Sequence, residues 1–145
     1  MKWFFDTSVL IAALVPDHPY HARSFPMFAS ATRKQAACAA HSLAEAYSTF
    51  TRYPGKERMS AEAASLMVQG IEHRFTVVWL DGAEYCAAIR RMAQLGIVGG
   101  AVYDGLVASC ALKAGADHLY TWNVRHFDLL GAEIKKLVTM PPAAV

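Results

Sequence analysis

Residues 2–14 read KWFFDTSVLIAAL, and this stretch sets the expectation for the whole fold. Residues 2–5 are aromatic and β-favouring, so we predict a strand that ends at Asp6. The two hydroxyl residues that follow, Thr7 and Ser8, are typical N-caps and predict a short helix over the apolar remainder of the stretch. A strand that passes directly into a helix is typical of an α/β fold.

The same alternation of strands and helices continues along the chain. Further strands are predicted at residues 35–40, 75–80, 118–121 and 134–139, and helices at residues 19–32, 42–53, 60–73, 81–95 and 101–114. We therefore predict one α/β domain, residues 1–145, with a mainly parallel central sheet of about four to five strands flanked by helices. In such sheets ligands bind beyond the carboxyl ends of the strands, which is where Asp6 lies.

The composition excludes several classes of protein. With 54% hydrophobic residues the chain is not disordered. No apolar run approaches the roughly 20 residues of a membrane span, so no membrane association is expected. The three cysteines, Cys38, Cys86 and Cys110, predict small buried residues in a reducing cytoplasm rather than a disulfide or zinc framework. A net charge of +2 is too small to indicate a nucleic-acid partner.

Three acidic residues stand where chemistry is expected, and each has a structural alternative. Asp6 follows a buried strand, and its alternative role is to cap the next helix. Glu45 fits a capping box with Ser42, which would explain it as a helix-start residue, yet it faces the same strand-end surface. Asp104 lies in an almost entirely apolar segment, where it is either an acid at the positive end of a helix or a ligand of a cation. If the three acids cluster, at least one should hold a proton more readily.

A fourth candidate region, residues 119–128, leaves a strand and enters a polar loop. Asn123 could bind a metal through its amide oxygen, and Thr121 could support it by hydrogen bonding. The alternative is a turn built around Asn123, with Phe127 anchoring the loop to the core.

Four segments occur in the order and spacing of the PIN domain, namely residues 6–10 (DTSVL), 42–45 (SLAE), 103–108 (YDGLVA) and 121–127 (TWNVRHF). The chain resembles this family over essentially its whole length, and within it the VapC-type ribonuclease toxins of bacterial toxin–antitoxin pairs. The resemblance implies a single PIN-like domain that hydrolyses RNA phosphodiester bonds with one or two Mg²⁺ or Mn²⁺ ions.

The resemblance assigns the metal-binding and catalytic acids of the family to Asp6, Glu45 and Asp104. Asn123 occupies the fourth acidic position of the family and is assigned a catalytic place with them. This departure leaves a first metal expected and a second one in question. His126 stands where many members carry Asp, and Asp128 is a candidate substitute whose direction the sequence does not reveal.

Several neighbouring side chains are expected to support this site. The hydroxyls of Thr7, Ser8 and Thr121 are candidates to orient the carboxylates or contact the phosphate. Arg125 is a candidate phosphate contact. The plainer alternative for the hydroxyls is capping and turn formation, and for Arg125 a solvated surface.

The resemblance also implies the partners. These are an RNA substrate, for which single strands are favoured because their bases can stack on aromatic side chains, a second copy of the chain in a homodimer, and a small antitoxin that inserts into the acidic site. Two other functions stay open. One is a PIN-like module that binds RNA without cutting it, because of Asn123. The other is a phosphatase with Asp6 as nucleophile, although that chemistry usually places a second Asp where this chain has Ser8.

Overall fold

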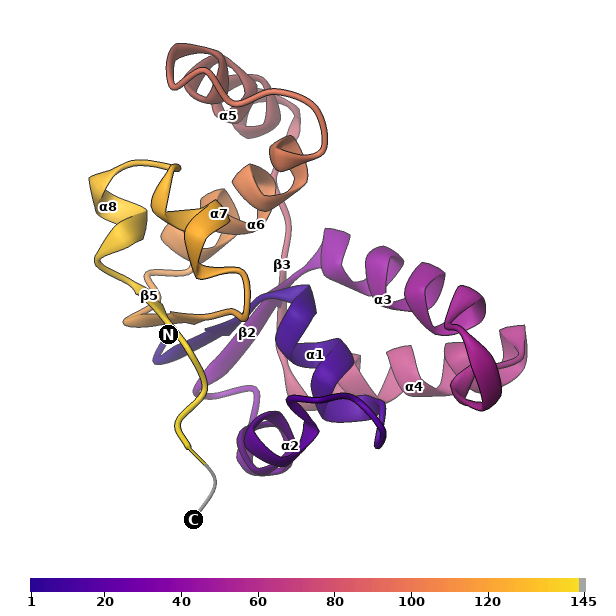
Figure 1. Cartoon of the computed structure of the whole chain (residues 1–145). Coiled ribbons are helices and arrows are strands. Elements are labelled where there is room, and N and C mark those ends of the chain that lie inside the picture. The colour runs from indigo at the N-terminus through magenta and orange to yellow at the C-terminus, as the bar shows by residue number, and fades with distance from the viewer. Residues whose placement is uncertain (144–145) are drawn as a thin grey trace.

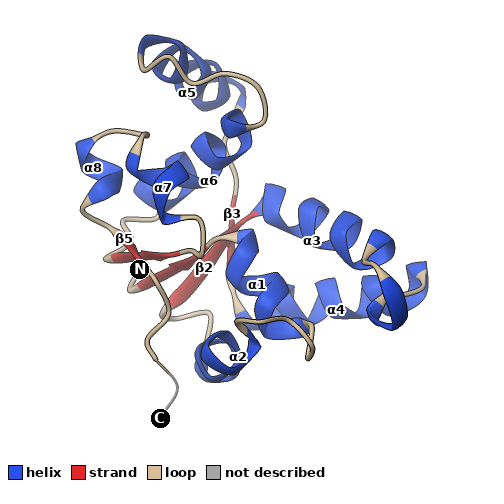
Figure 2. Cartoon of the chain, viewed as in Figure 1, coloured by secondary structure: helices blue, strands red, loops and turns tan. Residues whose placement is uncertain are grey.

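The computed structural model describes residues 1–143 and is built on one five-stranded sheet (Figure 2). All the strand pairs in this part of the chain are parallel, and the strand order is β3-β2-β1-β4-β5. The strands are β1 (Trp3–Phe5), β2 (Ala36–Ala39), β3 (Thr76–Val78), β4 (His118–Tyr120) and β5 (Val138–Thr139). The predicted α/β class with a parallel sheet is confirmed.

Helices cover both faces of this sheet (Figure 1). They are α1 (Thr7–Leu14), α2 (His21–Ser30), α3 (Ala40–Arg52), α4 (Ala61–Arg74), α5 (Gly82–Gln94), α6 (Ala101–Lys113), α7 (Val124–Asp128) and α8 (Ala132–Lys135), with a 3₁₀ turn, η1, at Gly55–Glu57. The first four helices lie on one side of the sheet and α6 to α8 on the other, while α5 stands furthest from the strands. No helix within residues 1–143 combines the length and the apolar content that crossing a bilayer requires.

The two layers follow from the alternation of side chains along the central strand β1. Phe5 points to the side of α1 to α4 and packs edge-on against Phe75, with ring centroids 4.9 Å apart. Phe4 points to the opposite side and joins a second core with Val107 and Phe127. Helices therefore cover both faces of β1, and the residues that follow its carboxyl end lie at the edge of the sheet between the two helical layers.

Some hydroxyls predicted to cap helices are used differently. α1 begins at Thr7, and its N-cap residue is Asp6, whose side chain makes no capping hydrogen bond. Strand β2 runs into α3 without a loop, so this helix already begins at Ala40. Ser42 therefore lies inside the helix, fully buried, and the predicted capping box with Glu45 is wrong.

After β4 the chain turns through residues 121–123 and then forms α7, so only part of the predicted polar loop is a loop. Asn123 is the N-cap residue of α7, and Phe127 is buried on the inner face of that helix. The strand predicted over residues 134–139 is shorter than expected, because Ile134 is buried as part of α8 and only the last two residues pair as β5.

The cysteines agree with the prediction except for one. All three are free, and Cys38 and Cys110 are buried. Cys86 is exposed, because α5 places only Ala88 and Met92 in the core and leaves its remaining residues at or near the surface.

Candidate functional site

Asp6 is the centre of the candidate site. It follows β1, the middle strand, and its backbone N–H donates to the carbonyl of Tyr120 at the end of the neighbouring β4. The chain order in the sheet reverses between these two strands, which is where α/β sheets usually bind ligands. The Asp6 side chain is 3% exposed, and its Oδ2 accepts hydrogen bonds from Ser8 Oγ at 2.7 Å and Thr121 Oγ1 at 2.8 Å.

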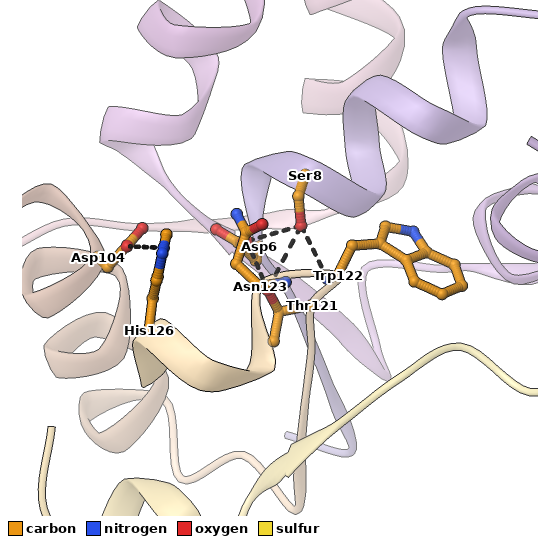
Figure 3. A network of polar contacts seen from close by, with 7 residues as sticks. All are labelled: Asp6, Ser8, Asp104, Thr121, Trp122, Asn123 and His126. Carbon is orange, nitrogen blue, oxygen red and sulfur yellow. Dashed lines mark hydrogen bonds and ion pairs between the residues drawn. The ribbon is translucent and has the colours of Figure 1, made fainter. Parts of the chain in front are cut away.

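The same two hydroxyls tie the segment after β4 to the start of α1 (Figure 3). Ser8 Oγ accepts a hydrogen bond from the backbone N–H of Trp122 at 3.0 Å. Thr121 Oγ1 accepts one from the backbone N–H of Asn123 at 2.9 Å. Since both oxygens also donate to Asp6, the carboxylate, the helix start and this segment are held as one network.

Glu45 and Asp104 approach the same region from two other helices. Thr7 Oγ1 donates to Glu45 Oε1 at 2.9 Å and lies 2.8 Å from Ser42 Oγ, which fixes the second turn of α3 against α1. Asp104 lies in the first turn of α6, and its Oδ2 is 3.5 Å from His126 Nδ1. The acids therefore come from the end of β1, from α3 and from α6, which are far apart in the sequence.

One pocket of about 470 Å³ brings these side chains together. Its lining includes the predicted residues Asp6, Thr7, Ser8, Glu45, Asp104 and Asn123. It also includes His18 and Tyr20, which carried no functional signal in the sequence, and Trp122, which lies in the fourth candidate region but was assigned no role. Thr121 lies behind the pocket wall, fully buried, and reaches the site through Asp6.

Other predicted residues lie outside the pocket. Arg125 is exposed on α7. Neither Arg125 nor Asp128 is among the described residues that line the pocket. The His126 side chain contacts the site through Asp104, and its backbone N–H donates to the carbonyl of Asn123 at 3.0 Å. The site therefore centres on three carboxylates and one amide, Asn123.

Burial makes this a costly place for negative charge. It raises the pKa of Asp6, against the lowering effect of the hydrogen bonds from Ser8 and Thr121. It also raises the pKa of Asp104 to about 6, with the negative charge of Asp6 adding to the effect and His126 opposing it. The direction of both shifts agrees with the prediction that a clustered carboxylate holds its proton more readily, but burial contributes more than the repulsion between acids.

The donor set suits a hard divalent cation. Carboxylate and amide oxygens are the ligands that Mg²⁺ and Mn²⁺ prefer. Within residues 1–143 no Lys or Arg pairs with the three acids. His41 lies 3.8 Å from Glu45, and His126 lies beside Asp104. No three His, Cys, Asp or Glu side chains in the same residues lie close enough to share one ion. The chemistry therefore fits a cation, and the carboxylates would have to draw together around it.

A comparison with known families decides what kind of domain this is. A family model for the PIN domain matches residues 3–130. The chain belongs to the PIN domain family. Its relatives include Ribonuclease VapC27 of Mycobacterium tuberculosis, which is 39% identical over 114 residues, or 77% of this chain and 78% of that protein. The resemblance to VapC-type proteins that the sequence motifs indicated is confirmed.

Solved structures agree on the fold of this PIN domain. VapC20 of Mycobacterium tuberculosis, described as a toxin that cleaves the sarcin-ricin loop, superposes with a TM-score of 0.70 at 15% identity, covering 86% of this chain and 92% of that one. VapBC2 of Rickettsia felis, bound to a DNA fragment from its promoter, superposes with a TM-score of 0.64 at 19% identity, covering 97% and 98%. At these identities the likeness establishes the fold alone.

Proposed function

We propose that this PIN domain is a metal-dependent endoribonuclease and the toxin of a VapBC-type pair. The observation that carries the proposal is the buried Asp6 carboxylate, held without a Lys or Arg partner in residues 1–143, in a pocket shared with Glu45 and Asp104. Its relatives carry the name ribonuclease, and acids of this kind suit metal-assisted hydrolysis of a phosphodiester.

Asp6, Glu45 and Asp104 would hold the ion. When bound, a divalent cation can activate water for attack on a phosphodiester and offset charge on the phosphate. The chain's own contribution is orientation. Ser8 and Thr121 orient Asp6 by hydrogen bonds, and Thr7 orients Glu45, while the carboxylates would still have to draw together around the ion.

Asn123 sets the charge of the site. It lies on the pocket wall at the N-cap of α7, where an acid would add a fourth negative charge. An amide oxygen can ligate a cation but brings no charge of its own. Three carboxylates can neutralise one divalent ion but not two, so we propose one resident ion.

The proposed partners follow the same resemblance. The substrate is RNA, and the inhibitor is a small antitoxin that presents a cation, such as Arg, to the acidic pocket. VapBC2 of Rickettsia felis and VapBC-1 of Haemophilus influenzae, both similar in fold, support a VapBC-type pair, and the homodimer is proposed from the family resemblance. Three free cysteines suit the reducing cytoplasm, where such a pair would act.

The test is cleavage of RNA by the purified protein with Mg²⁺ or Mn²⁺. Asp6→Asn and Asp104→Asn should each slow cleavage by more than about 100-fold, since several kcal/mol of transition-state stabilisation would be lost. Asp117→Asn, which changes an exposed acid outside the pocket, is the matched control and should cut like the wild type. Calorimetry with Mn²⁺ should show binding by the wild type and weakened binding by both site variants.

Two rival functions have distinct outcomes in these experiments. A protein that binds RNA but never cuts it is the non-catalytic module. A phosphatase would instead form a phospho-aspartate at Asp6. The geometry disfavours that role, because Asp6 is buried and one of its oxygens already accepts hydrogen bonds from Ser8 and Thr121.

A further inference from the structure

An aromatic pair stands at one end of the acidic pocket. The rings of Tyr20 and Trp122 are stacked, with centroids 4.0 Å apart and planes 10° from parallel. Both residues line the pocket, although Tyr20 precedes α2 and Trp122 follows β4. In Figure 3 the Trp122 indole points away from Asp104 and His126.

Trp122 is held rigidly. Its indole N–H donates to the fully buried Ser24 Oγ at 2.9 Å, and its backbone N–H donates to Ser8. The Arg23 guanidinium carbon also lies over the indole, 4.9 Å from the ring centroid. With these contacts in place, Trp122 serves as the support. The Tyr20 ring has the tilted His18 ring beside it, with centroids 5.8 Å apart, and Tyr20 remains 43% exposed.

The charge around this pair favours a neutral, flat ligand. The pocket beside it carries three carboxylates, which repel a further phosphate but not an uncharged ring. Arg23, the cation at the pair, is already engaged, because it packs on Trp122 and donates to the carbonyls of Pro141 and Pro142. An exposed aromatic ring in this setting is suited to stacking with a nucleobase.

We propose that Tyr20, supported by Trp122, is the stacking platform for a nucleobase next to the scissile phosphate. This inference rests on the proposed ribonuclease function and adds a determinant of substrate binding to it. Tyr20 positions the single strand, while the carboxylates carry the chemistry. Stacking needs an unpaired base, so the platform also selects single-stranded over duplex RNA.

The experiment compares kinetics on a short single-stranded RNA that the wild type cuts at one position. Tyr20→Ala and Tyr20→Leu should raise KM by roughly 5- to 100-fold, the range expected for loss of one stacked base, with a much smaller change in kcat. Tyr20→Phe keeps the stacking ring and should recover most of the affinity that Tyr20→Ala loses. Tyr85→Ala removes a similarly exposed tyrosine on α5, outside this pocket, and serves as the matched control.

A second measurement separates stacking from a structural role. Removing single bases next to the cleavage site should weaken wild-type binding at one position by a factor similar to Tyr20→Ala. Removal of that base combined with Tyr20→Ala should weaken binding no more than either change does alone. If the effects multiply at every position, or if Tyr20→Ala leaves KM unchanged, the platform is refuted. Thermal midpoints of all variants check that each is folded.

RNA binding measured without cleavage tests the role of Tyr20 separately from the proposed ribonuclease activity. Affinities are measured by fluorescence anisotropy with Mg²⁺ in an Asp104→Asn background, with and without Tyr20→Ala. If the wild type never cuts RNA but Tyr20→Ala weakens binding, the platform stands and the nuclease proposal fails. If the wild type cuts and Tyr20→Ala changes neither KM nor affinity, the nuclease proposal stands and the platform fails.

Discussion

Replacing Asp104 by Asn should stabilise the metal-free protein, although the residue is assigned to the active site. Burial raises the pKa of Asp104 to about 6, so the folded state binds its proton more tightly than the unfolded chain, where the ordinary value is 3.8. The stability from this proton is fully present below pH 3.8 and is lost as the pH rises through about 6. At pH 7.5 the folded protein therefore carries an unfavourable charge that Asn removes.

The magnitude follows from the two pKa values. Their difference, from 3.8 to about 6, corresponds to an upper figure of about 3 kcal/mol at 1.36 kcal/mol for each tenfold change in proton affinity. The Asp104 side chain is 24% exposed, so water reduces this cost. We expect Asp104→Asn to raise the free energy of unfolding by about 1–3 kcal/mol at pH 7.5 in EDTA, and by much less at pH 4.

Urea denaturation at several pH values between 4 and 8 measures this difference. Asp117→Asn should show no comparable gain, because that residue is exposed. Added Mg²⁺ should then stabilise the wild type more than Asp104→Asn, since a ligand that binds only the folded state raises its stability. An Asp104→Asn gain that is the same at pH 4 and pH 7.5, or a loss of stability at pH 7.5, would refute the reasoning.

Three further predictions concern the framework around the site. Thr121→Val should lower the free energy of unfolding by about 1–3 kcal/mol in urea denaturation, because it removes a buried hydrogen bond to Asp6 and the acceptor of a backbone N–H. Gly105→Ala should change the free energy of unfolding by less than about 1 kcal/mol in the same measurement, because its Cβ would meet the flexible Met92 side chain, with Sδ at 2.0 Å, and because Ala favours the interior of α6 over Gly; the same change should be more favourable in a Met92→Ala background, where that contact is absent. Asp81→Ala should cost about 1 kcal/mol and lower the thermal midpoint, because Asp81 Oδ1 accepts from the Glu84 N–H at the start of α5.

The acidic part of the site could be predicted because its signals are local. Asp6 follows a short strand that is buried apart from its first residue, and strand ends in parallel sheets are where ligands bind. Asp104 is the one acid in an apolar segment, which marks it without knowledge of its neighbours. Both residues line the pocket. The parallel sheet was predictable for a similar reason, since alternating strands and helices leave few other arrangements.

The aromatic part could not be predicted, because its signal is tertiary. Tyr20 sits at the start of α2, in a segment with no motif. Only the folded chain brings it onto Trp122. The roles of two hydroxyl residues could not be predicted for a related reason. Local patterns made Thr7 and Ser42 helix caps, whereas each lies within hydrogen-bond distance of the other, with α1 packed on α3.

The use of hydroxyls rather than cations around the acids has an energetic consequence. A Lys or Arg beside Asp6 would lower its pKa, but it would also neutralise the charge that attracts a metal ion. Ser8 and Thr121 donate hydrogen bonds and orient the carboxylate while leaving its charge in place. In the folded protein the negative charge of Asp6 and Asp104 is therefore unfavourable, as their raised pKa values indicate. A bound divalent cation would offset this charge. In this site the carboxylates that destabilise the metal-free fold are the same groups that would supply its affinity for metal.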